Sequence, residues 1–288
     1  GSLLQSTLLA RYSLSRSLTH SSHRPASAMS AKAIREATGK DIINRNLGSG
    51  TVAAKCRFAS VTESTDFAQL AVENPWLKTE KLVVKPDQLI KRRGKLGLIK
   101  VNADYATVKE WVGQRMNKDQ QVGKASGKLR NFIIEPFLPH KEDEEAYVCI
   151  YSHRYADTIL FYHQGGVDIG DVDAKALKVD VPIDSTITAA QIESSLLKEL
   201  KPAKKKMVAT FIEKLYSMYQ NLYFTYLEVN PLVVTSDAIY ILDLAAKLDA
   251  TADFVCRGLW GEVDYPPPFG RDALPEEAYI ADLDAKSG

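Results

Sequence analysis

The chain has 288 residues, of which 45% are hydrophobic and 25% charged, the composition of a folded globular protein of one or two domains. Its 37 basic and 36 acidic residues nearly cancel, so charge gives no case for nucleic acid or an anionic membrane as a partner. No run approaches the ~18 consecutive apolar residues of a membrane-spanning helix. Three widely spaced cysteines argue against a disulfide framework and favour a reducing compartment.

Residues 1–28 differ from the rest in composition. They contain eight serines and three arginines, Arg11, Arg16 and Arg24, and no acidic residue. Two interpretations stay open for this leader: an organelle transit peptide, or upstream sequence translated ahead of Met29. The segment carries a charge of +3, so the remainder of the chain is mildly acidic.

The first elements are predicted from spacing and proline. Residues 31–45 lack proline and carry apolar residues at roughly helical spacing, which predicts a helix. Residues 82–86 predict a strand that ends at a proline, and residues 98–101 predict a second strand. Residues 105–117 predict another helix.

A basic turn lies between these two strands. Lys85 ends the first strand, and seven residues later Arg92, Arg93, Gly94 and Lys95 bring three cations and a flexible backbone together. Cations with exposed backbone N–H groups suit a polyphosphate, whereas the alternative is a solvated basic turn. Spacing alone leaves both interpretations open.

The middle of the chain is rich in predicted strands, at residues 132–137, 147–151 and 158–163. In the first of them, Pro136 removes a backbone donor and so frees neighbouring groups to face a ligand, which is a weak signal. Residues 142–145 are predicted to form a solvated acidic loop. The five histidines show neither metal-binding spacing nor a nearby Ser or Cys, so nucleophilic catalysis is unsupported.

The clearest predicted helix covers residues 207–222, whose apolar residues form one stripe. The basic run at residues 201–206 is predicted to be its solvated approach. Strands are then predicted at 224–234 and 238–244. Helices and strands mix without a regular βαβ alternation, so the predicted fold class is α+β, or mixed α/β.

A tight turn between the last two predicted strands would place Asn230 opposite Asp243. Facing side chains in an antiparallel pair lie about 4.5–5.5 Å apart at Cβ. An amide oxygen and a carboxylate at that distance could share a hard cation such as Mg²⁺. The alternative is an Asx pair that satisfies local backbone groups, and a loop of three or five residues would break the register.

Several motifs together resemble the N-terminal ATP-grasp region of the ATP-citrate lyase (ATP-citrate synthase) family, over essentially all of Met29 to Gly288. They are Val83–Lys95, Ile134–Phe137, Gly165–Asp171, Tyr226–Leu232, Leu242–Lys247 and Glu276–Gly288. The resemblance to the β subunit of succinyl-CoA synthetase is more distant. The ATP-citrate lyase resemblance implies two ATP-grasp lobes, at residues 29–130 and 131–264, with a nucleotide between them. It makes residues 265–288 a connector towards a citrate-binding domain.

The resemblance also implies roles for individual residues. ATP would be contacted by Lys85, Arg92, Arg93, Gly94, Pro136, Leu138 and Glu145. Of these, the backbone of Pro136 and Leu138 would contact adenine, and Glu145 would lie at the ribose. Mg²⁺ would be held by Asn230 and Asp243, with Asp284 and Ser287 at positions that the family associates with magnesium.

In the family, ATP phosphorylates a histidine, and citrate and CoA are then converted to acetyl-CoA, for lipid biosynthesis, and oxaloacetate. The resemblance implies that the phosphohistidine and the citrate and CoA regions lie beyond Gly288. The chain would then be a cytoplasmic fragment, inactive alone, of a homo-oligomeric enzyme; a mitochondrial location would require the transit peptide. Two alternatives are a succinyl-CoA-synthetase-type ligase β subunit and a nucleotide-binding module without turnover.

Overall fold

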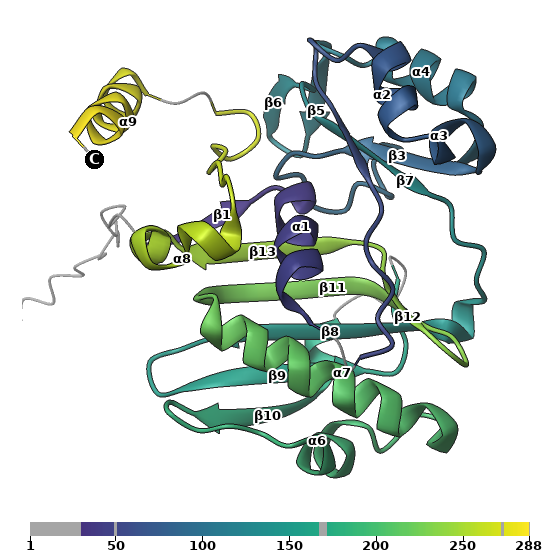
Figure 1. Ribbon diagram of the computed structural model, residues 1–288, viewed down its shortest axis with the longest axis vertical. Coiled ribbons are helices and arrows are strands. Elements are labelled where there is room, and N and C mark those ends of the chain that lie inside the picture. The colour runs from purple at the N-terminus through teal and green to yellow at the C-terminus, as the bar shows by residue number, and fades with distance from the viewer. Residues whose placement is uncertain (1–29, 49–50, 167–171, 272–273, 288) are drawn as a thin grey trace, which may run out of the picture.

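The computed structural model describes residues 30–48, 51–166, 172–271 and 274–287. These residues form two lobes, each built on an antiparallel sheet with its own hydrophobic core (Figure 1). The predicted mixture of helices and strands is confirmed.

The large lobe is built on a sheet with seven strands among the described residues. Their order is β1 (Ala31–Ile34), β13 (Leu244–Asp249), β11 (Phe224–Val234), β8 (Glu145–Ser152), β9 (Ala156–Tyr162) and β10 (Leu177–Pro182), and β12 (Ile239–Ile241) pairs with β11. Residues of α1 (Glu36–Asn46), α6 (Ala189–Leu196), α7 (Pro202–Asn221) and α8 (Asp253–Trp260) share one core with this sheet. Short helices α5 (Val172–Lys175), η1 (Glu142–Glu144) and η2 (Ala250–Ala252) lie in its connections.

The small lobe is built on four strands in the order β2 (Ala59–Val61), β7 (Phe132–Pro136), β3 (Leu82–Pro86) and β4 (Lys100–Ala103). Its other elements are α2 (Phe67–Glu73), α3 (Trp76–Thr79), α4 (Tyr105–Gly113) and the hairpin of β5 (Asp119–Val122) and β6 (Ala125–Lys128). Gly123, with a φ of +59°, turns that hairpin.

Each sheet combines strands that precede residue 130 in the sequence with strands that follow it. β1 and α1, near the start of the described chain, belong to the large lobe, whereas β7 belongs to the small lobe. Beyond α8 the chain runs back between the lobes, because Tyr265 packs against the large core and Phe269 against the small core. It then continues to α9 (Pro275–Ser287), drawn in yellow in Figure 1.

The predicted helix at residues 31–45 is wrong in its first part. Residues 31–34 form β1, which pairs antiparallel with β13 from Ala31 opposite Asp249 to Ile34 opposite Ala246. A run of four residues is too short for spacing to separate strand from helix, so the tertiary pairing decides. The strand predicted at 98–101 lies two residues later, as β4.

Two later predictions also change. The strand predicted at 238–244 is two strands, β12 and β13, with Leu242 and Asp243 between them. The basic run at 201–206 lies largely inside α7, which begins at Pro202, because proline fits the first position of a helix. The apolar stripe of that helix, which includes Phe211 and Leu215, is buried as predicted.

Among the helices that the structure describes, none combines the length and the apolar content needed to cross a bilayer.

Candidate functional site

Six charged side chains from both lobes meet where the lobes face each other, and they are here called the charged cluster. Its members are Glu36 and Lys40 of α1, Lys85 of β3, Arg93 of the following turn, Glu135 of β7, and Asp243 between β12 and β13. Lys40 is fully buried. Only Asp243, whose side chain is 35% exposed, has substantial solvent access.

Glu36 is the centre of the charged cluster. Its Oε1 lies 2.7 Å from the Nζ atoms of both Lys40 and Lys85, and its Oε2 lies 2.6 Å from Arg93 Nη2. Burial alone would raise the pKa of Glu36, but the three cations hold this pKa well below its ordinary value. Glu36 therefore remains ionised and orients all three cations.

The charged cluster also joins the connection between β12 and β13, in the large lobe, to the small lobe. The Nζ atoms of Lys40 and Lys85 each donate to the Leu242 carbonyl at 2.9 Å. Lys40 pairs with Glu135, and Arg93 pairs with Asp243, whose Oδ1 lies 3.7 Å from Lys85 Nζ. Leu242 and Asp243 are held by these cations, at the point where the sheet ladder is interrupted.

A second carboxylate fixes the start of α1. The residue before this helix, Arg35, makes no side-chain cap, and Asp87 at the end of β3 supplies one from the other lobe. Its two oxygens accept from the backbone N–H groups of Glu36, at 2.8 Å, and Ala37, at 3.3 Å. Burial, with a contribution from Glu36, raises the pKa of Asp87 to about 6.

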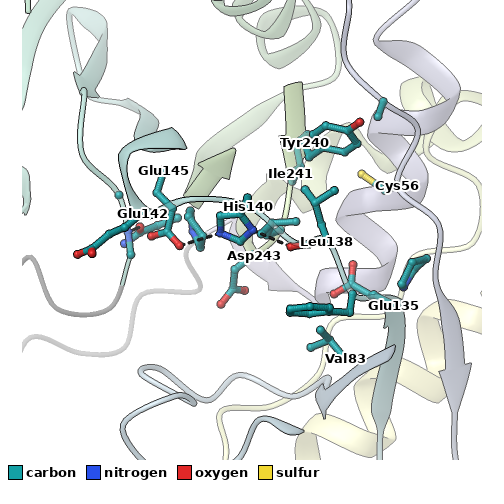
Figure 2. Close-up of a pocket in the computed structure, with 18 of the residues that line it drawn as sticks. Cys56, Val83, Glu135, Leu138, His140, Glu142, Glu145, Tyr240, Ile241 and Asp243 are labelled. Carbon is teal, nitrogen blue, oxygen red and sulfur yellow. Dashed lines mark hydrogen bonds and ion pairs between the residues drawn. The ribbon is translucent and has the colours of Figure 1, made fainter. Parts of the chain in front are cut away.

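A cavity of about 1110 Å³ lies beside the charged cluster and is lined from both lobes. Apolar side chains such as Val83, Phe137 and Ile241 line part of it, and Lys85, Glu135 and Asp243 contribute charge. Figure 2 shows Val83, Ile241, Glu135 and Asp243 around the cavity. Its volume slightly exceeds the range of about 300–1,000 Å³ that is usual for small-molecule sites. The lining therefore combines an apolar surface with charged side chains of both signs.

The linker between β7 and β8 forms another wall of the cavity. Pro136, Leu138 and Glu145 all line it. Phe137 N–H donates to the Lys81 carbonyl at 2.7 Å, which fixes the linker beside β3. The N–H group of Leu138 donates to no group in the described residues, so it is available to a ligand.

The predicted register of β11 and β12, which places Asn230 opposite Asp243, is confirmed. β11 pairs with β12 from Leu232 opposite Ile241 to Val234 opposite Ile239, and Asn230 N–H donates to the Asp243 carbonyl at 3.1 Å. The Asn230 side-chain oxygen accepts from Gly166 N–H at 2.8 Å. The second oxygen of Asp243, Oδ2, accepts no hydrogen bond from the residues that the structure describes.

These oxygens fit a hard cation, because an amide and a carboxylate both border the cavity. The described part of the chain contains no group of three or more His, Cys, Asp or Glu side chains arranged for a metal ion. A cation here would therefore need further oxygens from a ligand or water.

The structure brings some predicted site residues together and not others. Six of them line the cavity, namely Lys85, Pro136, Leu138, Glu145, Asn230 and Asp243. Arg93 is buried beneath it and reaches Asp243, whereas Arg92 and Gly94 are exposed in the turn and are not among the lining residues. Asp284 and Ser287 belong to α9, but their side chains lie outside the described residues.

Sequence reasoning missed Glu36, Lys40 and Asp87. Glu36 and Lys40 are four residues apart on the face of α1 that also carries buried Ile43. A Glu–Lys pair on an apolar helix face is the signal that would have identified them, since charges there need partners. Asp87 gave no such signal, because its partners are backbone groups of another element.

Comparison with known proteins identifies the family. A family model described as the ATP-citrate synthase ATP-grasp domain matches residues 30–260. The ATP-citrate synthase of Bos taurus is 55% identical over 261 residues, which cover 90% of this chain and 24% of that protein. The probable ATP-citrate synthase subunit 2 of Schizosaccharomyces pombe is 40% identical, over 90% of this chain and 65% of that protein.

A solved structure agrees with these relatives. The ATP citrate lyase of Methanothrix soehngenii, solved with citrate and coenzyme A, matches with a TM-score of 0.79 and 38% identity, over 90% of this chain and 61% of that one. The present chain spans about a quarter of the length of the Bos taurus relative. The resemblance and the two-lobed ATP-grasp fold expected from the sequence are confirmed, and the chain belongs to the ATP-citrate synthase ATP-grasp domain family.

Proposed function

We propose that this chain binds Mg-ATP between its two lobes, as the nucleotide-binding part of an ATP-citrate synthase. The observation that carries the proposal is the charged cluster, in which Lys85 and Arg93 of the small lobe meet Asp243 of the large lobe beside a cavity of about 1110 Å³. Family membership supports ATP as the ligand.

The triphosphate would lie at the charged end of the cavity. Lys85 and Arg93 are oriented there by Glu36, and phosphate oxygens would compete with Asp243 for these cations. Arg92 and Gly94, exposed in the same turn, would contact the phosphates if the turn moves towards the cavity. The protein's contribution is to position the phosphates and neutralise their charge.

Adenine would lie at the linker. The free N–H of Leu138 offers a donor to the ring, the backbone of Pro136 lies beside it, and Val83, Phe137 and Ile241 offer apolar surface. Glu145, farther along the same wall, would face the ribose hydroxyls. This arrangement puts adenine and triphosphate at opposite ends of one cavity.

Asn230 and Asp243 would hold Mg²⁺, with Asp284 and Ser287 of α9 as further candidate ligands. The bound ion supplies positive charge against the phosphates. Because Arg93 is ion-paired with Asp243 through Oδ1, its charge opposes free Mg²⁺ at Oδ2, whereas Mg-ATP brings phosphate oxygens that take over the arginine. We therefore infer that metal and nucleotide bind together.

The affinity of ATP in the presence and absence of Mg²⁺, measured by titration calorimetry, tests this site. Lys85→Met and Asp243→Asn should each weaken binding at least about tenfold, since each removes a charge-assisted contact. The control Lys78→Met changes an exposed lysine of α3 and should leave the affinity unchanged. Unchanged affinity in both site variants would overturn the assignment.

The whole enzyme would make acetyl-CoA, for lipid biosynthesis, and oxaloacetate from citrate, CoA and ATP. This step of the proposal rests on relatives named ATP-citrate synthase and on a relative solved with citrate and coenzyme A. We expect no citrate- and CoA-dependent ADP release from the 288-residue chain alone. ADP release would contradict the assignment of the remaining machinery to other regions and favour a self-sufficient enzyme.

The compartment and assembly remain part of the proposal. Cys56, Cys149 and Cys256 form no disulfide in the described chain, which suits a reducing compartment such as the cytoplasm. We propose a homo-oligomer for the full-length enzyme. The name of the Schizosaccharomyces pombe relative, subunit 2, supports assembly from more than one kind of chain in some members.

A further inference from the structure

His140 joins the two parts of the linker that face the nucleoside end of the cavity. Its Nδ1 lies 2.7 Å from the Leu138 carbonyl oxygen, and its Nε2 lies 2.9 Å from Glu145 Oε1 (Figure 2). The His140 and Glu145 side chains are only 16% and 20% exposed. One imidazole therefore connects the proposed adenine contact to the proposed ribose contact.

The two contacts fix the orientation of the His140 ring. A carbonyl oxygen can only accept, so Nδ1 must donate to Leu138. Nε2 then faces a carboxylate oxygen, and a hydrogen bond between them requires one further proton, carried by the ring or shared with Glu145.

The contact between His140 Nε2 and Glu145 Oε1 also positions the second carboxylate oxygen, Oε2. Glu145 Oε2 lies so close to Gly166 that a Cβ atom built there would come within 2.2 Å of it, so only glycine fits beside this carboxylate. Gly166 also has a φ of +100° and donates to Asn230. Oε2 accepts no hydrogen bond within the described chain, and it remains available to a donor from a ligand.

We propose that His140 is a positioning residue that sets recognition of the ribose hydroxyls by fixing Glu145 against the linker. The proposal rests on the nucleotide site proposed above. With Oε1 bound to His140, the carboxylate presents Oε2 as an acceptor at a fixed distance from Leu138. Without the imidazole, Glu145 would gain rotamer freedom, and its contact to the ribose would lose strength more than the contacts to adenine and phosphate would.

Binding of ATP and of 2′,3′-dideoxy-ATP, each with Mg²⁺, tests the proposal by calorimetry on the 288-residue chain. The wild-type chain should prefer ATP by at least about tenfold, as expected for a hydrogen bond to a carboxylate. His140→Ala should reduce this preference to below about threefold, mainly through weaker ATP binding. His140→Gln, which retains a donor, should give an intermediate preference.

A double-mutant cycle separates positioning from independent contacts. If His140 acts through Glu145, then His140→Ala combined with Glu145→Gln should lose no more preference than Glu145→Gln alone. His153 provides a control, because it is exposed between β8 and β9 and is not among the residues that line the cavity. His153→Ala should keep the wild-type preference.

The outcomes are distinguishable. A wild-type chain that binds no ATP overturns the proposed function, and this inference with it. A wild-type chain that prefers ATP, with His140→Ala keeping that preference or losing affinity for both nucleotides equally, overturns only the role of His140. Equal loss for both nucleotides would mean that the histidine merely supports the fold of the linker.

Discussion

At the scale of single residues, the least expected feature is a fully buried lysine. Lys40 has no exposed surface, and it is satisfied by Glu36, Glu135 and the Leu242 carbonyl. Burial lowers the pKa of an amine, but the carboxylates of Glu135 and Glu36 reverse this and raise the pKa of Lys40 above its ordinary value. The charge is therefore permanent, and its removal takes one cation from each of two carboxylates, Glu36 and Glu135, which would then share Lys85.

Lys40→Met should lower the free energy of unfolding by about 3–5 kcal/mol, the usual cost of breaking a buried ion pair from one side. Urea denaturation of the wild-type and variant chains measures this loss. Arg257→Met serves as the control, since Arg257 pairs with Asp253 on the surface of α8 with its side chain 76% exposed. Arg257→Met should change the free energy of unfolding by no more than about 1 kcal/mol. A similar loss in both variants would contradict this description of the charged cluster.

Asp87 predicts a pH dependence of stability. Its pKa is raised to about 6 in the folded chain, against 3.8 for an ordinary aspartate. The folded state therefore binds more protons than the unfolded state between about pH 4 and pH 6, and this carboxyl makes stability fall as the pH rises through that window. Across this window the free energy of unfolding should fall by about 3 kcal/mol because of this one carboxyl.

Asp87→Asn should remove this contribution. Its free energy of unfolding relative to wild type should increase between pH 4 and pH 6, as followed by urea denaturation at several pH values. Asp249→Asn should change in the opposite direction and at lower pH, at and below the ordinary aspartate pKa of 3.8, because hydrogen bonds to Thr251 lower the pKa of Asp249 although burial opposes them. A constant difference between Asp87→Asn and wild type would show that Asp87 is not the titrating group.

At the scale of elements, α1 contacts the large sheet through a glycine. A Cβ atom at Gly39 would lie 2.6 Å from Cδ2 of Leu244, a buried side chain of β13. Alanine normally stabilises a helix by about 1 kcal/mol relative to glycine. Here Gly39→Ala should instead destabilise the chain, because overpacking costs about 1–3 kcal/mol.

Gly258 is the matched control for that substitution. It lies within α8, and a Cβ atom there meets nothing within 4 Å. Gly258→Ala should raise the melting temperature, and Gly39→Ala should lower it. Adding Leu244→Val to Gly39→Ala should recover part of the loss, since the colliding methyl group is removed. Two substitutions that act in the same direction would mean that α1 and β13 are not in close contact.

The sequence predicted individual elements well where local pattern and tertiary pairing agree. The stripe of α7 and the register that puts Asn230 opposite Asp243 both follow from spacing and one tight turn. β1 was missed, because nothing in residues 31–34 distinguishes a strand until β13 pairs with it. The cations at Lys85 and Arg93 were identified, but the carboxylate that orients them, Glu36, belongs to a distant element.

At the scale of the whole molecule, the lobes have separate hydrophobic cores and are joined by charge. Lys85 and Arg93 of the small lobe bind Glu36 of the large lobe, and Lys40 of the large lobe binds Glu135 of the small one. A ligand that contacts both lobes should therefore stabilise the chain as a unit. The interleaving of the two sheets was beyond sequence reasoning, because it depends on which distant strands pair.

Scanning calorimetry tests this coupling. Mg-ATP at 100 times its dissociation constant should stabilise the chain by about 2.7 kcal/mol. The melting temperature should then rise by about 5–10 °C. Lys85→Met should show a smaller rise at the same nucleotide concentration. No change in melting temperature at saturating Mg-ATP would indicate that the nucleotide does not bind the folded chain.

The most direct test of the central claim is a crystal structure of the chain with Mg²⁺ and a non-hydrolysable ATP analogue. We predict adenine beside Leu138, ribose beside Glu145, phosphates against Lys85 and Arg93, and the metal between Asn230 and Asp243. A nucleotide bound elsewhere, or phosphates that leave the Arg93–Asp243 pair intact with no metal on Asp243, would contradict it.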